Sequence, residues 1–182
     1  MSELYTLRDW FDFNAHSRRG YLGALAKLPT EELSRDRGAS QPTLLDVLAH
    51  SAGEAVSFWI GRATIGKGDF PQLANLENPS LEDVRKYVEA VDLDTKRFLD
   101  GLTEKDLDRT FRIPKGGSFP EEIVLSVRDM LWHLVEEERQ HRGELNALRW
   151  QLDVDPPIFD WFDWVKLPQH HRIVGGGPPP TR

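Results

Sequence analysis

The stretch WHLVEEERQHRGEL, residues 132–145, places titratable side chains where a helix with this pattern is expected to bury its side chains. At about 100° per residue, Glu137, Glu138 and His141 fall within about 60° of the apolar stripe centred on Leu134. A carboxylate that leaves water without compensation costs several kcal/mol of stability. The three side chains therefore require a partner cation, a water-filled pocket or a metal ion.

Glu137 and His141 have the spacing of two metal ligands on one helix face. Residues four apart lie about one turn from each other, within reach of a single ion. The chain contains no cysteine, so a metal has to be held by His, Asp or Glu side chains. The same spacing also fits a contact at the rim of a helical bundle without a metal, and a metal site requires a third ligand.

The histidines that offer a third ligand are His16, His50, His133, His170 and His171. His50 is the most suggestive, because it lies in the middle of the helical pattern LLDVLAHSAGEAVSFW. The apolar face of that segment is formed by Leu44, Leu48, Ala52 and Trp59. On a helical wheel His50 lies almost opposite this face, and His133 lies about 100° from the apolar stripe of its own segment. Periodicity alone therefore places both histidines at the surface or the rim.

The composition is that of one folded domain without a nucleic-acid or membrane partner. With 182 residues, of which 39% are hydrophobic, the chain is long enough to bury a full core. The 30 acidic and 23 basic residues give a net charge of -7, and the absence of a basic run argues against nucleic-acid binding. No apolar run approaches the roughly 18 residues of a membrane span, and no signal pattern opens the sequence, so a cytoplasmic protein is expected.

Four helix starts share one local signal, a Ser or Thr followed three positions later by Asp. The pairs are Thr6/Asp9, Thr43/Asp46, Ser80/Asp83 and Ser126/Asp129. Such a hydroxyl accepts hydrogen bonds from the first-turn amides while the acid bonds back to the chain. The pattern predicts helices at about 4–28, 43–65, 80–101 and 126–152, and therefore an all-α four-helix bundle. The connections 29–42, 66–79 and 102–125 are long, so the order in which the helices pack stays open.

After Asp153 the helical pattern breaks into DPPIFDWFDW. Four aromatic residues, Phe159, Trp161, Phe162 and Trp164, predict that this extension folds back onto the bundle. Residues 1–165 are therefore expected to form the bundle with its aromatic extension. Residues 166–182 are expected to form a tail that is mobile at its end.

Three stretches resemble the DinB-like (DinB/YfiT) metal-binding four-helix bundles: DWFDFNAHSRR, then LLDVLAH with EAVSFW, then WHLVEEERQHRGEL. The similarity spans residues 5–152, and its most specific parts are the histidine of the second helix and the run from His141 to Glu144. Three side chains of that family bind zinc or nickel. The resemblance implies the ligands His50, Glu137 and His141.

Glu137 occupies a position that is most often histidine in that family. In this respect the sequence resembles the mycothiol-dependent maleylpyruvate isomerase branch, which uses a Glu between two histidines. Asn14 and His133 match frequent positions of the family, so the resemblance implies that they orient a ligand or bind substrate, and a structural role stays open for both. Glu54 and Glu138 lie close enough in sequence to the ligands to orient them, and Arg142 or His133 is a candidate to bind an anionic substrate.

Family members with an assigned activity bind a small-molecule thiol as the thiolate. The resemblance therefore implies a metal-dependent thiol S-transferase or thiol-dependent isomerase, with a small-molecule thiol and an electrophile as substrates. Two alternatives stay open: a metal-dependent hydrolase, and a non-enzymatic, stress-related metal-binding dimer. Trp132, Val135 and Trp150 form a second apolar stripe beside Gly143, which fits either a homodimer interface or a surface covered by the aromatic extension.

Overall fold

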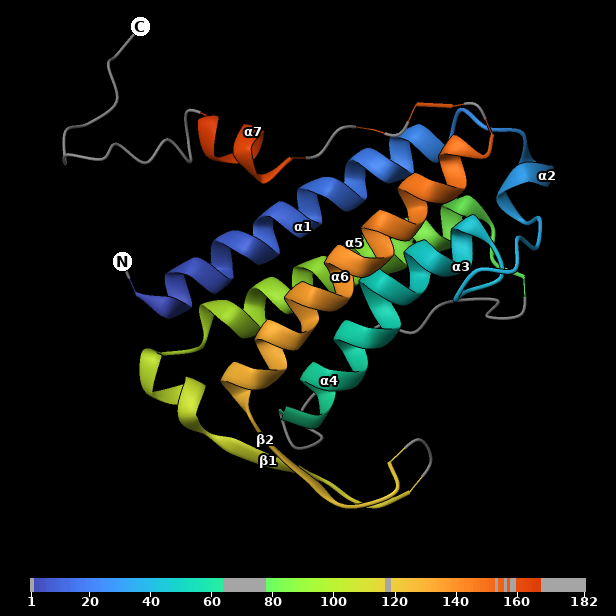
Figure 1. Ribbon diagram of the computed structural model, residues 1–182. Helices are drawn as coiled ribbons and strands as arrows, with labels where there is room; N and C mark the ends of the chain where they lie inside the picture. The colour runs from blue at the N-terminus through green and yellow to red at the C-terminus, as the bar shows by residue number, and fades with distance from the viewer. Residues whose placement is uncertain are drawn as a thin grey trace, which may run out of the picture.

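The computed structural model describes residues 2–63, 78–116, 119–152, 154–155, 157 and 160–167, with the backbone alone for 54–57. Within these residues, four long helical segments run side by side (Figure 1). They are α1 (Glu3–Leu25), α3 (Leu44–Ala49) continued through η1 (His50–Glu54) into α4 (Ala55–Ala63), α5 (Leu81–Asp100) and α6 (Val127–Trp150). The predicted all-α bundle is confirmed.

Three of the four predicted capping pairs begin their helices. Asp46, Asp83 and Asp129 each donate a backbone N–H to the hydroxyl three residues earlier and accept a backbone N–H in return. The fourth pair is wrong. Helix α1 begins earlier, with Ser2 as its N-cap, and Thr6 and Asp9 lie inside it.

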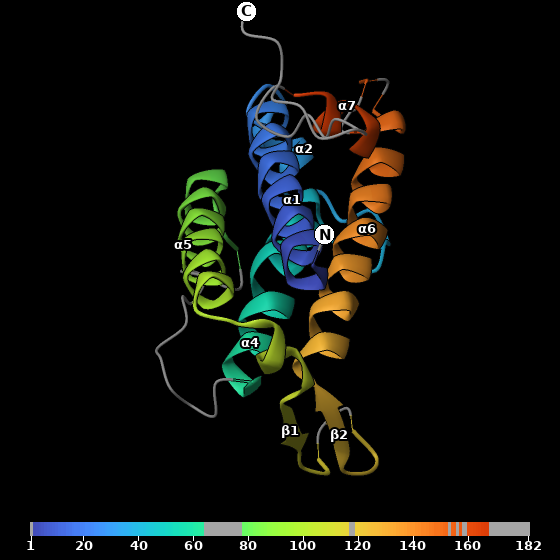
Figure 2. The ribbon, with the colours of Figure 1, turned by 90° about the vertical axis from the view of Figure 1, so that its left-hand side faces the viewer.

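Helix α1 packs against α5 and α6, and the α3–α4 segment packs against the same two helices. Arg8 near the start of α1 donates to the carbonyl of Leu99 at the end of α5 (2.8 Å), so these two helices are antiparallel. Trp132 near the start of α6 donates to Glu3 at the start of α1 (2.9 Å), so these two are parallel. Figure 2 shows α5 and α6 on opposite sides of α1. The packing order that the sequence left open is therefore resolved.

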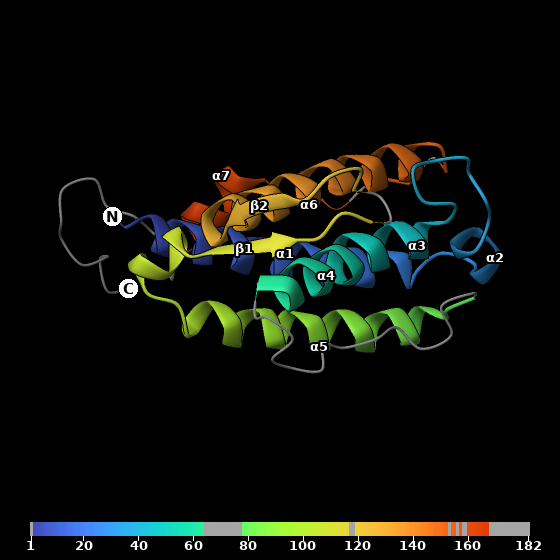
Figure 3. The ribbon, with the colours of Figure 1, turned by 90° about the horizontal axis from the view of Figure 1, so that it is seen from below.

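The connection between α5 and α6 contains a hairpin that the sequence did not predict. After the 3-10 turn η2 (Glu104–Asp108), strand β1 (Thr110–Ile113) pairs antiparallel with β2 (Ile123–Ser126). Ser126 ends β2 and is also the N-cap of α6, so the strand leads directly into the helix. The hairpin lies beyond the end of α4 and the start of α6 (Figures 1 and 3). The connection after α1 contains one further turn, α2 (Thr30–Leu33).

The aromatic extension contains a short helix, α7 (Trp161–Lys166), that packs against α1. Trp161 stacks on Trp10 with ring centroids 3.9 Å apart. Trp164 is buried and donates to Asp9 (2.9 Å). Phe162 is exposed. Phe159 and residues 168–182, which include most of the predicted tail, lie outside the described residues.

The three residues of the second apolar stripe of α6 lie in different environments. Val135 is buried, Trp132 is bound to Glu3, and Trp150 is 65% exposed. Trp161 and Trp164 have ring contacts with α1, and Trp150 stays exposed, so the extension does not cover the stripe as a whole. No helix in the described part of the chain has both the length and the apolar character needed to cross a membrane.

Candidate metal centre

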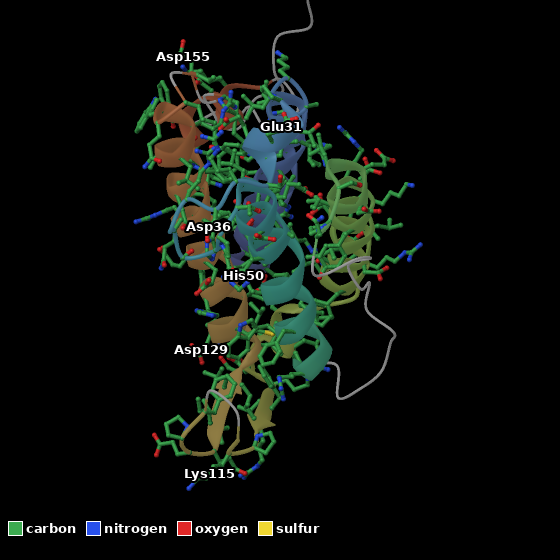
Figure 4. All side chains as sticks on the ribbon, turned by 90° about the vertical axis from the view of Figure 1, so that its right-hand side faces the viewer. Glu31, Asp36, His50, Lys115, Asp129 and Asp155 are labelled. Atoms are coloured by element: carbon green, nitrogen blue, oxygen red, sulfur yellow. The ribbon has the colours of Figure 1, made fainter. Side chains whose placement is uncertain are left out.

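His50 lies at the first residue of a π-helical turn that joins α3 to α4. A π turn takes up an extra residue and so rotates everything after it relative to a regular α-helix. The helical wheel placed His50 at the surface or the rim, and its side chain is half-buried. The His50 ring faces α6, with its centroid 4.9 Å from that of His141. Figure 4 labels His50 on the side of the α3–α4 segment toward α6.

The side chains of His50, Glu137 and His141 converge at this point. One ligand atom from each residue lies within 4.8 Å of the others. Nε2 of His141 lies 3.4 Å from Oε2 of Glu137. Two ligands that each lie about 2.1 Å from a tetrahedral zinc ion are about 3.4 Å apart, so this pair already has the separation that an ion requires.

Glu144 fixes the orientation of the His141 ring. Its carboxylate lies 3.1 Å from Nδ1 of His141, and it accepts bonds from the backbone N–H and the hydroxyl of Ser40, both at 2.7 Å. Burial raises the pKa of Glu144, but the hydrogen bonds from Ser40 and His141 outweigh burial and lower it. A carboxylate on Nδ1 leaves Nε2 of the same ring available to a metal. Glu144 was not predicted to have a role, although it belongs to the family motif. Its spacing of three residues from His141, which allows the two side chains to meet on one helix face, was the available signal.

Among the described residues, the carboxylate of Glu137 has no Lys or Arg partner. In the part of the chain that the structure describes, its ion pairs are with His133 (3.7 Å) and His141 (3.4 Å), and neither imidazole is cationic unless it is protonated. The side chain is 27% exposed. A half-buried carboxylate beside imidazole rings offers the oxygen and nitrogen ligands that suit a divalent cation.

Glu138, the next residue, has a different environment. It is buried and accepts from Arg18 of α1 (2.8 Å), which also binds Asp92 of α5. Burial raises the pKa of Glu138 against the opposing effects of Arg18 and Arg142. Burial alone would lower the pKa of Arg18, but Asp92 and Glu138 outweigh it and raise that pKa. Glu138 is therefore part of an ion network between three helices.

Asn14 and Arg142 contact each other on the side of α6 that faces α1. Arg142 donates to the Asn14 side chain (3.1 Å) and lies 4.8 Å over the ring of Phe13. Burial lowers the pKa of Arg142. These contacts describe a packed pair at the α1–α6 interface.

His133 lies at the rim of the three converging side chains. It is 43% exposed, with Nε2 3.7 Å from Glu137, and its ring centroid lies 5.1 Å from that of Trp59. The side chain of Glu54 lies outside what the structure describes.

A cavity of about 470 Å³ lies elsewhere in the structure, between α1 and α5, with Trp164 at one wall. His50, Glu137 and His141 do not line it. The cavity and the three converging side chains are therefore separate features.

Three protein ligands to a divalent ion leave at least one coordination position for water or a substrate. An ion in that arrangement acts as a Lewis acid, and two imidazoles with one carboxylate are compatible with several divalent metals. Among the described residues three side chains could ligate one ion, and three protein ligands are typical of an open metal site, whereas a structural zinc site has four.

Comparison with known proteins supports a relationship to DinB-like proteins. The chain is similar in fold to a crystal structure of a DinB-like protein from Bacillus cereus ATCC 10987, with a TM-score of 0.61 and 19% identity over 81% of this chain and 91% of that one. No curated protein matches the chain. The model of the DinB superfamily matches residues 15–145, which is more than half of the chain. The chain belongs to the DinB superfamily.

Proposed function

We propose that this protein binds a divalent cation, zinc or nickel, through His50, Glu137 and His141. The observation that supports the proposal most strongly is the convergence of these three ligand atoms from two helices, within 4.8 Å of one another. The Glu144 contact to Nδ1 of His141 adds the carboxylate that metal-bound histidines commonly have.

The proposed activity is the activation of a small-molecule thiol for transfer to an electrophile, or for the isomerisation of one. A bound divalent cation lowers the pKa of a thiol, as it does for water, and so makes the sulfur nucleophilic near neutral pH. The thiol proton passes to solvent, and the sulfur forms a bond to the electrophilic carbon. In transfer, the leaving group departs with its electron pair; in isomerisation, the thiol is released again.

Residues around the proposed metal ligands orient them and could contact a substrate. Glu144 and Ser40 keep Nε2 of His141 directed at the metal position. His133 stands at the exposed rim and can donate to an anionic substrate. Arg142, the other candidate for that role, is bound to Asn14 at the α1–α6 interface.

A turnover assay tests the proposal. The zinc- or nickel-loaded protein is supplied with an electrophile and, in separate assays, with glutathione, bacillithiol or mycothiol. We expect turnover that requires both metal and thiol and that is lost in His50→Ala. The matched control is Trp150→Ala, which removes an exposed side chain at the far end of α6 and is expected to retain activity. Turnover that is independent of thiol would contradict the proposal and point to hydrolysis.

A further inference from the structure

A row of aromatic side chains leads away from the proposed metal site. His133 contacts Trp59 edge-on at 5.1 Å, Trp59 contacts Phe119 at 6.2 Å, and Phe119 lies parallel to Phe58 at 6.3 Å. We call these four residues the aromatic wall. They come from α6, from α4 and from the loop between β1 and β2, so they are distant in sequence and adjacent in space.

The aromatic wall differs from the core in being partly open. The side chain of His133 is 43% exposed and Phe58 is 39% exposed, whereas Trp59 and Phe119 pack partly against the core. Arg62 lies 4.1 Å over the Phe58 ring and ends the row. Packing on one side holds the rings in place, and exposure on the other leaves ring surface for a ligand.

The wall begins at the proposed metal site. His133 contacts Glu137 (3.7 Å) and Trp59, so it connects a proposed ligand to the first ring of the wall. Residue 137 lies four positions after residue 133, a rise of about 6 Å along the helix, which a molecule of one or two rings can span. A substrate at the open coordination position would therefore lie against Trp59.

We propose that the aromatic wall binds the electrophilic substrate through a planar aromatic group. This inference rests on the proposed thiol chemistry. Small-molecule thiols such as glutathione and mycothiol are polar and carry no aromatic ring, so the wall fits the acceptor rather than the thiol. Ring–ring contacts are worth about 0.5–1.5 kcal/mol beyond the buried area, which favours an aromatic acceptor over a saturated one of equal size.

A binding experiment without turnover tests the inference directly. Calorimetric titration of the metal-loaded protein compares 2-naphthol with its saturated analogue decahydro-2-naphthol. We expect the wild type to bind the aromatic probe about fivefold more tightly, a ratio within the range of ring–ring contacts. Trp59→Leu is expected to remove that preference while keeping the wild-type metal content. Trp150→Leu, the matched control on an exposed tryptophan, is expected to retain it.

Equal binding of the two probes to the wild type, or an unchanged preference in Trp59→Leu, would overturn the aromatic wall as a binding surface. A kinetic comparison of an aromatic and a non-aromatic electrophile then tests the aromatic wall separately from the proposed thiol chemistry. With 1-chloro-2,4-dinitrobenzene, from which the sulfur displaces chloride, we expect Trp59→Leu to raise KM about fivefold. With iodoacetamide, which loses iodide and has no ring, we expect an unchanged KM. If the wild type showed no thiol-dependent turnover but still preferred 2-naphthol, the proposed function would be contradicted and the aromatic wall would stand.

Discussion

Glu137 and Glu138 are neighbours on α6, yet their carboxylates are balanced in different ways. Glu138 is buried and paired with Arg18, whose guanidinium also binds Asp92, so the protein supplies a permanent positive charge. Glu137 is half-buried and faces two histidines, with no Lys or Arg ion pair among the described residues. One carboxylate is therefore balanced within the structure, whereas the other has no Lys or Arg partner among the described residues and is the one that we propose binds a cation.

The largest effect is expected on the buried side of this comparison. Arg18→Met would leave Glu138 and Asp92 without their partner, and removing one member of a buried ion pair typically costs about 3–5 kcal/mol. We expect a loss of that size in the free energy of unfolding, measured with urea. Arg139→Met is the matched control, since its pair with Glu136 is exposed and is worth less than about 1 kcal/mol. A similarly small loss in Arg18→Met would show that the network is not structural.

A pH dependence is expected from Tyr21, which is buried near this network. Burial raises the pKa of Tyr21 from 10.0 to about 12. Between these values the unfolded chain has lost the phenol proton and the folded chain keeps it, so stability falls as pH rises. A change of about two pKa units corresponds to about 3 kcal/mol.

Urea unfolding between pH 9 and pH 12 measures this loss. In Tyr21→Phe, which lacks the hydroxyl bonded to Asn146, we expect the pH dependence to be shallower by about that amount. Identical slopes in the two proteins would show that Tyr21 titrates as an exposed residue.

A smaller effect is expected on the open side of the comparison. Glu144→Gln removes the carboxylate that orients His141, and changes at such positions typically weaken metal binding about 10- to 100-fold. Competition with a chromogenic chelator measures the affinity for zinc. Glu136→Gln, at an exposed position on the same helix, is the control and should bind as the wild type does. An affinity within about twofold of the wild type in Glu144→Gln would show that Ser40 or the fold alone positions the ring.

The sequence predicted the parts of the fold that depend on local signals. Thr43, Ser80 and Ser126 begin their helices as predicted, because a capping box is decided by residues three apart. The predicted start of α1 at about residue 4 is close to the observed Glu3, but its capping pair was wrong because the N-cap, Ser2, is followed three positions later by Tyr5 rather than by an acid. Strand β2 was missed because a strand of four residues is defined by its partner, β1, and not by its own pattern.

The inward position of Glu138 and His141 was predictable from helical periodicity, and both side chains are buried. The contact between His50 and His141 was not predictable from the wheel, since the wheel of one segment does not say which helix packs beside it. Arg18 was also missed as the partner of Glu138, because the two residues lie 120 positions apart and only tertiary structure brings them together. Helical periodicity thus identified the charged residues on the inner face of α6, and long-range contacts decided which of them has a Lys or Arg ion-pair partner.

The metal content of two single-residue variants tests most directly the claim that Glu137, and not Glu138, binds a cation. Glu137→Gln and Glu138→Gln change neighbouring residues in the same way and can be equilibrated with zinc beside the wild type, dialysed and measured by mass spectrometry. We expect one metal ion per chain in the wild type and in Glu138→Gln, and almost none in Glu137→Gln. Equal metal content in all three proteins, or loss in Glu138→Gln alone, would contradict the proposed site.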